Sequence, residues 1–248
     1  MLDNVISVIQ PNILPCLIAF YLGYGGYRKK SLNLSGAISA IFVGFVAVRY
    51  GGLFETLVLL FFFYSSSKLT KYKSDVKKLR EDGFQGGEGH RNWEQVLANG
   101  GFPTVLLLVR QLLLVSSSAA GGTTVDGGSN NHSFLFQHLI PGLLSGDSWN
   151  NSEVMMPKLV FILWTYIGVY CANCADTWSS EVGILSQTEP RFILAPWRTV
   201  PYGTNGGVSA KGLWAAILCG LSYGVLITCY IAIELLIRTL FLSEGKGT

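Results

Sequence analysis

Charged residues are scarce in this sequence, and that scarcity argues against a soluble fold. Only 13% of the 248 residues are Asp, Glu, Lys or Arg, against about 25% in a typical soluble domain. Half of the residues are hydrophobic, and they lie in long runs instead of alternating with polar residues at helix or strand period. The net charge of +3 is too small to indicate a nucleic-acid partner. The sequence therefore predicts a single integral membrane domain over residues 1–248.

Several signatures of other protein classes are also missing. The N-terminus lacks a basic segment followed by a signal-peptide cleavage site, so we expect the first apolar run to be retained. The five cysteines lie in or beside apolar runs, which favours packing over a disulfide framework. Cys171 and Cys174 form a CxxC without a second Cys or His pair, so a zinc or redox site has little support.

Long apolar runs are the main feature that the sequence does have. Because a membrane-spanning helix needs about 20 mostly apolar residues, we predict an all-α fold, a polytopic bundle of about six transmembrane helices with polar loops. The predicted spans are residues 5–24, 34–48, 52–64, 96–115, 159–175 and 212–237. Proline and polar residues at positions 10–15 predict that the first span is kinked or partly interfacial.

Most of the 18 basic residues lie in three connections, those after the first, third and fifth spans. An excess of Lys and Arg marks cytoplasmic loops, so we predict that these connections are cytosolic and that both termini lie on the other side. Residues 65–95 form the predicted cytosolic basic loop. Residues 116–157 carry no Lys or Arg and form the predicted non-cytosolic loop.

Two carboxylates stand where the fifth span meets the predicted cytosolic face. Asp176 and Glu181 are flanked by hydroxyl side chains. Mg²⁺ takes one or two protein carboxylates and completes its shell with water and phosphate oxygens, so both residues are candidate metal ligands and catalytic groups. The alternative interpretation is a helix cap followed by a solvated acidic turn.

A glycine-rich segment precedes the sixth span. Gly203, Asn205, Gly206 and Gly207 would let backbone N–H groups approach an anion, next to the N-terminus of the following helix. A tight turn into a membrane helix explains the same residues equally well.

The basic loop supplies candidate phosphate ligands. Lys68 and Lys71 would contribute point charges, and Arg91 can bind a phosphate with two parallel hydrogen bonds. Juxtamembrane lysines also commonly contact anionic lipid headgroups, which is the simpler interpretation. Carboxylates, a glycine-rich loop and basic residues on one face are together the parts that phosphoryl transfer requires.

Five segments in this order resemble the transmembrane-protein-19 family. They are GYRKKSLNLSGA from Gly26, SSSKLTKYK from Ser65, RNWEQVLANG from Arg91, ADTWSSEVG from Ala175 and VPYGTNGGVS from Val200. The resemblance covers about residues 24–212. Members of the family continue past the sixth span with further helices, so we expect this chain to be short at its C-terminus.

The resemblance implies an activity, because the plant relative is a phytyl-phosphate kinase. It implies Asp176 and Glu181 as Mg²⁺ ligands, Lys68, Lys71 and Arg91 as phosphate ligands, and Gly203, Asn205, Gly206 and Gly207 as the cradle for a nucleotide or a prenyl phosphate. CTP or ATP would be the phosphoryl donor. The expected location is an endomembrane such as the endoplasmic reticulum, or the plastid envelope in a plant.

We therefore predict a lipid-bilayer enzyme that transfers a phosphoryl group from a nucleotide to a prenyl monophosphate. The alternative is a non-catalytic membrane protein, either a transporter or a lipid-binding scaffold. Arg110 is the ionisable residue placed deepest in a predicted span, and a transporter would depend on such a residue.

Overall fold

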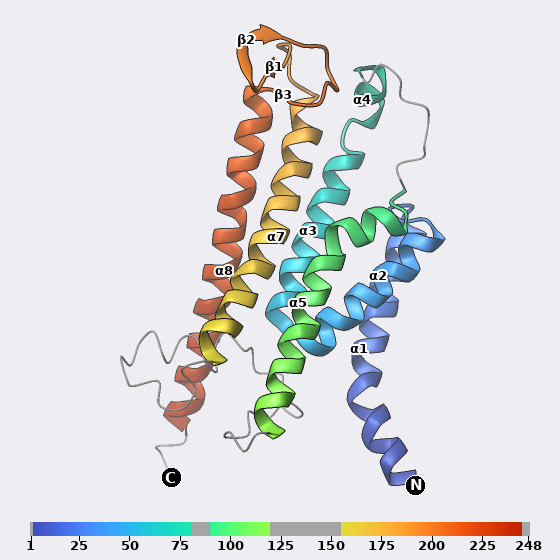
Figure 1. Ribbon diagram of the computed structural model, residues 1–248, viewed down its shortest axis with the longest axis vertical. Helices are drawn as coiled ribbons and strands as arrows, with labels where there is room; N and C mark the ends of the chain where they lie inside the picture. Colours follow the sequence, from blue (N-terminus) through green and yellow to red (C-terminus); the bar gives the residue numbers. More distant parts are fainter. Residues whose placement is uncertain (1, 81–89, 120–154, 245–248) are drawn as a thin grey trace.

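The protein is a bundle of long helices with a small sheet at one end (Figure 1). The structure, a computed structural model, describes residues 2–80, 90–119 and 155–244. The helices are α1 (Leu2–Arg28), α2 (Leu34–Val46), the π-helix η1 (Ala47–Gly51), α3 (Leu53–Lys71), α4 (Ser74–Arg80), α5 (Trp93–Ala119), α7 (Met155–Gly183) and α8 (Ala210–Glu244). Most of the predicted loop 116–157 lies outside the described residues.

Five helical segments in the described part are long and apolar enough to cross a membrane. They are 34–51, 53–71, 93–116, 157–183 and 210–237, and they correspond to the second through sixth predicted spans. The first predicted span forms α1, one continuous helix of 27 residues. At about 1.5 Å per residue α1 is about 40 Å long, enough for a hydrocarbon core of about 30 Å. Its membrane crossing stays a prediction.

Two of the predicted loops begin as helix, which corrects their boundaries. Helix α3 continues from Ser65 to Lys71, and α7 continues past Ala175 to Gly183. Neither stretch contains a proline, and the Thr70 hydroxyl donates back to the carbonyl oxygen of Ser66 at 3.0 Å. The polar ends of helices α3 and α7 therefore extend beyond the apolar spans.

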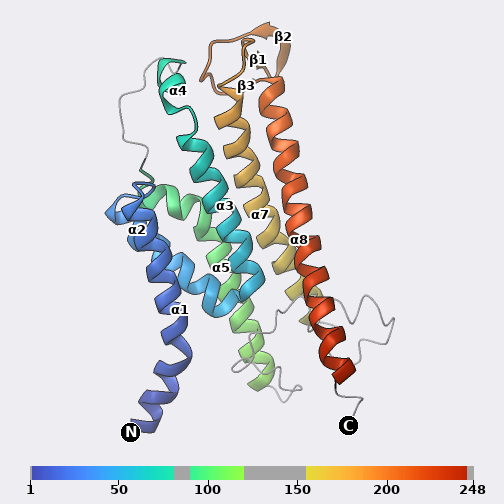
Figure 2. The ribbon, with the colours of Figure 1, turned by 180° about the vertical axis from the view of Figure 1, so that it is seen from behind.

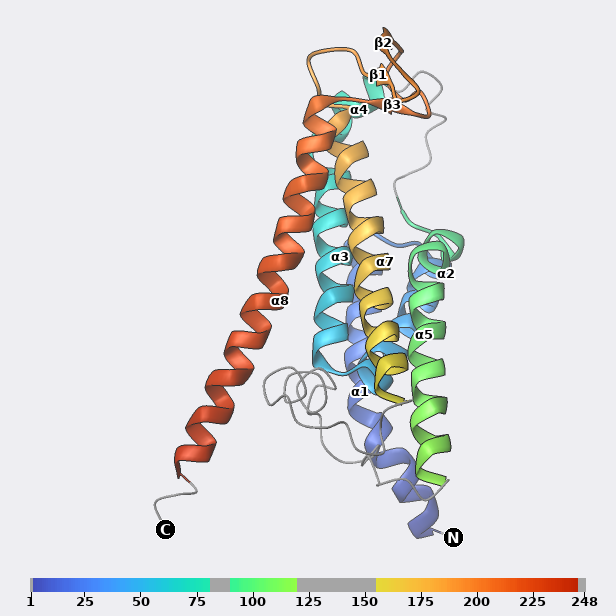
Figure 3. The same ribbon diagram turned by 60° about the vertical axis from the view of Figure 1, so that its left-hand side comes forward.

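The connection between α2 and α3 is a tight turn inside the bundle. Helix α2 ends in the π-helix η1, and Gly52 has a φ of 100°, a left-handed conformation that glycine adopts without strain. Figures 1 and 3 show that this turn stops short of the level reached by the lower ends of α1, α5 and α8. The ion pair between Glu55 and Arg110 lies at this turn.

Helix α5 bends near Pro103, which lies inside it. Its first turns run across the bundle and the rest runs along it (Figures 1 and 2). Proline has no N–H to donate to the residue four positions earlier, which here is Asn99. The Asn99 carbonyl oxygen instead accepts a hydrogen bond from Asn173 Nδ2 of α7 at 3.1 Å. The carbonyl group that Pro103 leaves without a helical partner is therefore satisfied by a neighbouring helix.

The core is aromatic and lies between α3, α5, α7 and α8. Its largest buried side chains include Tyr166, Tyr170 and Tyr223. The Tyr170 ring packs against Phe62 of α3 with centroids 5.6 Å apart. Helix α8 is the most peripheral candidate span, with 11% of its window buried against 39% for α7. Its outward apolar side chains suit contact with lipid.

A three-stranded antiparallel sheet connects α7 to α8, an element that the sequence analysis did not predict within a mostly helical fold. Its strands are β1 (Arg191–Phe192), β2 (Ala195–Thr199) and β3 (Gly207–Val208), in the order β2-β1-β3. Figure 1 shows the sheet at the same end of the bundle as α4. The connections with most of the basic residues therefore share one end, here called the polar end.

Candidate functional site

Lys77 and Glu181 form an ion pair at the polar end. Glu181 lies in the last turns of α7, and Lys77 Nζ of α4 donates to its Oε2 at 2.5 Å. The same ammonium group donates to the carbonyl oxygens of Leu69 at 2.6 Å and Thr70 at 3.4 Å. Lys77 is only 7% exposed. It therefore satisfies the C-terminus of α3 and neutralises Glu181 at once.

Arg80 fastens the other end of α4. Its Nη1 donates to the carbonyl oxygens of Ile184 at 2.8 Å and Ser186 at 2.5 Å. Its guanidinium lies 4.9 Å from the centroid of the Tyr202 ring, whose hydroxyl also donates to Ser186. Helix α4 is thus held against the end of α7 and the sheet.

Arg91 is positioned by backbone pairing next to the start of α2. Its N–H donates to the Ser31 carbonyl oxygen at 3.0 Å, and its own carbonyl oxygen accepts from the N–H of Asn33 at 3.1 Å. A Cβ on Gly36 would lie 2.1 Å from the Arg91 carbonyl oxygen. Only glycine therefore permits this approach.

The Arg91 side chain points into the bundle. Its guanidinium lies over the Phe62 ring, 5.6 Å from the centroid. Burial lowers the pKa of Arg91, while Glu181 and the Cys174 thiol act in the opposite direction. Arginine keeps its charge in proteins, so a cation is held close to Glu181. We call Lys77, Arg91, Cys174 and Glu181 the Arg91 cluster.

Hydroxyl and thiol groups continue the Arg91 cluster between α3 and α7. The Ser65 hydroxyl lies 3.4 Å from Cys174 Sγ and accepts a hydrogen bond from Trp178 Nε1 at 3.2 Å. The Ser66 hydroxyl lies 3.9 Å from the same sulfur. These contacts fix α3 and α7 relative to one another where the apolar core gives way to polar groups.

A cavity of about 70 Å³ opens beside Arg91. It lies among α1, α2, α3, α7 and the start of α5, and its lining is almost entirely apolar. Arg91, Gln95 and Asn99 supply its polar edge. A charged cluster and an apolar cavity therefore meet at one arginine.

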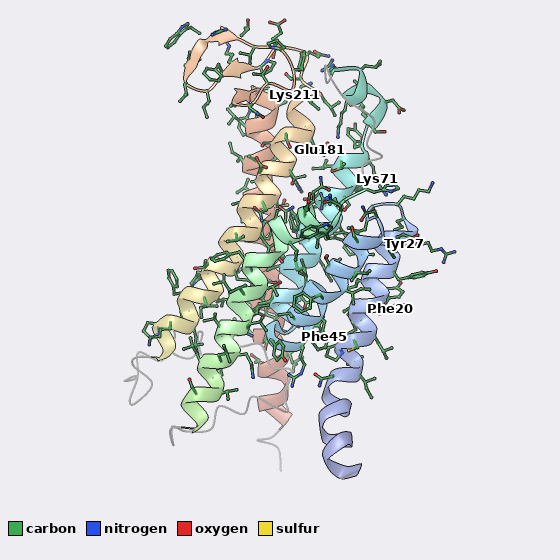
Figure 4. The ribbon with its side chains drawn as sticks, turned by 45° about the vertical axis from the view of Figure 1, so that its right-hand side comes forward. Phe20, Tyr27, Phe45, Lys71, Glu181 and Lys211 are labelled. Atoms are coloured by element: carbon green, nitrogen blue, oxygen red, sulfur yellow. The ribbon has the colours of Figure 1, made fainter. Side chains whose placement is uncertain are left out.

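The predicted phosphate ligands divide into one cluster member and two surface residues. Arg91 belongs to the cluster. Lys68 is exposed on α3. The exposed Lys71 donates to the carbonyl oxygen of Lys29 at 2.5 Å and so caps the end of α1. Figure 4 labels Lys71 and Glu181 near the same end of the bundle.

Asp176 and Glu181 face different directions on α7, and their roles as Mg²⁺ ligands stay a prediction. They are five residues apart on the continuous helix α7, so their side chains leave the axis about 140° apart, at about 100° per residue. Asp176 is exposed, whereas Glu181 pairs with Lys77. Within the described ranges, no group of three or more His, Cys, Asp or Glu side chains could hold a metal ion.

The glycine-rich segment forms a turn of the sheet. Gly203 and Gly206 have φ angles of 81° and 79°, and the N–H of Gly207 donates to the Thr204 carbonyl oxygen at 2.9 Å. Asn205 is exposed between them. The N–H of Gly207 thus serves the turn itself, and anion binding by this segment stays a prediction.

From the sequence, Lys77 and Arg80 were expected only to contribute positive charge to the basic loop 65–95. Their spacing of three residues places them on the same side of a short helix, and that spacing was the available signal. Their neighbours Lys73 and Lys78 have the same side-chain chemistry, so composition alone could not separate them.

Comparison with known proteins places these features in a family. Residues 17–244 match the family described as integral membrane protein DUF92. Protein PGR of Arabidopsis thaliana is 33% identical over 218 residues, which are 86% of this chain and 62% of that protein. The uncharacterized membrane protein MJ0933 of Methanocaldococcus jannaschii is 22% identical over 224 residues, 90% of this chain and 71% of that protein. The chain thus spans less than two thirds of Protein PGR. No solved structure matches.

Proposed function

Given that this chain belongs to the DUF92 family of integral membrane proteins, we propose that it is a membrane kinase acting on a prenyl monophosphate. It would transfer the terminal phosphoryl group of CTP or ATP to the substrate phosphate and form a prenyl diphosphate. The family membership confirms the predicted resemblance and the multi-pass membrane character. The reaction, its nucleotide and its substrate are our proposal.

The observation that carries the proposal is the position of Arg91. This cation is half-buried at the junction of a polar cluster and an apolar cavity. Phosphoryl transfer depends mainly on positioning and on charge that neutralises the phosphate oxygens. A prenyl monophosphate is an apolar chain that ends in an anion, so its two parts match the two sides of Arg91.

Lys77 is the second cation of the proposed site. Its contacts to Glu181 and to the end of α3 hold its charge in place, so Glu181 acts as a positioning residue for Lys77. Mg²⁺ would arrive with the nucleotide, since phosphate oxygens and water supply most of its ligands. Asp176, exposed at the same end, would add at most one carboxylate. In this proposal the polar end faces the cytosol, where the nucleotide is supplied, and the membrane is an endomembrane such as the endoplasmic reticulum or, in a plant, the plastid envelope.

The test is an assay of the full chain in nanodiscs. The protein is given labelled CTP or ATP, Mg²⁺ and phytyl or geranylgeranyl phosphate, and diphosphate is measured. We expect Arg91→Gln to lower kcat/KM by about 100-fold, as loss of a charge-stabilising donor commonly does. Lys158→Gln is the matched control, because Lys158 is exposed near the start of α7, at the other end of the bundle.

Failure to form diphosphate with either nucleotide would refute the kinase. Equal activity of Arg91→Gln and wild type would refute the site. Asp176→Asn reports separately on this exposed carboxylate. A variant that needs more Mg²⁺ but reaches the same maximal activity would support its role as a metal ligand. Transport is not proposed, because Arg110 pairs with Glu55 and donates to backbone carbonyl groups at the α2–α3 turn.

A further inference from the structure

The cavity beside Arg91 has the lining of an amphiphile site. Leu22 of α1, Val43 of α2 and Leu59 of α3 belong to its apolar walls. Its polar side chains include Arg91 and Gln95, from the start of α5 and the residues before it. An apolar cavity of this kind stays dry and binds apolar groups, while its arginine edge suits an anion.

Arg91 has no carboxylate within ion-pair distance among residues 2–80, 90–119 and 155–244. Its nearest aromatic contact, the Phe62 ring, stabilises a cation without neutralising it. Glu181, whose charge acts on Arg91, is itself paired with Lys77. The guanidinium can therefore still take an anionic ligand at the edge of the cavity.

We propose that the cavity holds the first branched unit of a prenyl chain whose monophosphate pairs with Arg91. The inference rests on the proposed function and locates the apolar half of its substrate. The cavity volume of about 70 Å³ is about half that of an apolar cavity of about 150 Å³ that binds one benzene. It therefore accepts at most one such unit and not the whole chain.

The rest of the chain has an exit toward the bilayer. Leu22, Ala40 and Leu60 line the cavity and are only half-buried. They come from α1, α2 and α3, so the half-exposed part of the lining lies among these helices. The chain beyond its first unit would leave through this part of the lining and stay in lipid. The protein would therefore discriminate between substrates by the branching next to the phosphate more than by total chain length.

The test measures binding of labelled geranylgeranyl monophosphate to the full chain in nanodiscs without nucleotide, so that no turnover occurs. Ala40→Phe fills the cavity from α2. Because a misfit of even one methylene in an apolar pocket can cost about tenfold, the added phenyl ring should weaken binding about tenfold or more. Ile38→Phe is the matched control, because Ile38 lies on the same helix and is 61% exposed; its affinity should stay within about twofold of wild type.

Competing ligands separate the two halves of the site. Dodecyl phosphate, which is unbranched, should compete less well than geranyl phosphate. Geranylgeraniol should bind Arg91→Gln and wild type with equal affinity. Inorganic phosphate should bind Arg91→Gln more weakly than it binds wild type. Competition by inorganic phosphate that equals that of the prenyl phosphates would show an anion site without a chain site and overturn the proposal.

Ala40→Leu, a smaller change, serves as a second cavity variant, and both are checked for an unchanged helix signal by circular dichroism. Wild-type affinity in a folded Ala40→Phe or Ala40→Leu variant overturns the inference even if kinase activity is present. Cavity-dependent binding without diphosphate formation would instead sustain the inference while the proposed kinase function fails. The two ideas are therefore separately refutable.

Discussion

Replacing Arg110 by methionine tests the buried ion pair at the α2–α3 turn. Arg110 of α5 pairs with Glu55 of α3 and donates to the carbonyl oxygens of Tyr50 and Gly51, the latter at 2.9 Å. The two charged residues are 4% and 1% exposed. Methionine keeps much of the apolar length of the side chain and removes every donor. The change therefore isolates the charge and its hydrogen bonds.

The expected loss follows from these contacts. Removing one partner of a buried ion pair costs about 3–5 kcal/mol, and a buried carbonyl group left without its donor costs about 1–3 kcal/mol. These costs overlap, so we expect the free energy of unfolding to fall by about 4–5 kcal/mol. Adding Glu55→Gln removes the isolated carboxylate. The double variant should recover about 1–3 kcal/mol.

The measurement is unfolding in mixed micelles by titration with sodium dodecyl sulfate, followed by circular dichroism. Arg49→Met is the control, because Arg49 is half-buried and its Nε donates to Asn12 Oδ1 at 2.9 Å. We expect this control to lose about 1–2 kcal/mol, the usual contribution of one partly buried hydrogen bond. An Arg110→Met variant that is no less stable than Arg49→Met would refute the reasoning, as would a double variant no more stable than Arg110→Met alone.

Two further predictions concern the polar end. Glu181→Gln should free the Lys77 ammonium and raise its acylation rate several-fold in mass-spectrometric footprinting, because the ion pair at 2.5 Å is lost; an unchanged rate would show that the backbone carbonyl groups alone hold Lys77. Gly36→Ala should lower the free energy of unfolding by about 1–3 kcal/mol in the same micelle titration, because the new Cβ would lie 2.1 Å from the Arg91 carbonyl oxygen. Gly25→Ala, with no atom within 4 Å of its new Cβ, is the control, and equal losses would contradict the prediction.

The membrane character and the order of the spans were predictable from sequence. An apolar run such as 212–237 is expected to form a membrane helix, because only a helix satisfies all of its backbone hydrogen bonds within hydrocarbon. The family resemblance, carried by segments such as that from Arg91, was confirmed by the match over residues 17–244. The helix ends were less accurate: α3 extends to Lys71 and α7 to Gly183, since polar residues without a breaker can continue a helix beyond the bilayer.

The candidate site was predictable only in outline. Arg91 was expected near the polar end and lies there, but its burial and its cavity depend on five helices that no local pattern relates. The sequence analysis placed Asp176 and Glu181 in a loop, whereas both lie on the continuous helix α7; their binding of Mg²⁺ stays a prediction. On a helix, five residues turn the two carboxylates away from each other.

The sequence alone determined that this chain enters a membrane and gathers its polar connections at one end, because hydropathy and basic-residue bias are sums over contiguous stretches. Tertiary structure alone decided which charges meet. Lys77 and Glu181 are 104 positions apart, and their contact depends on the packing of α4 against α7. Such pairing depends on helix register and on distance in space. Neither quantity can be read from a contiguous stretch of sequence.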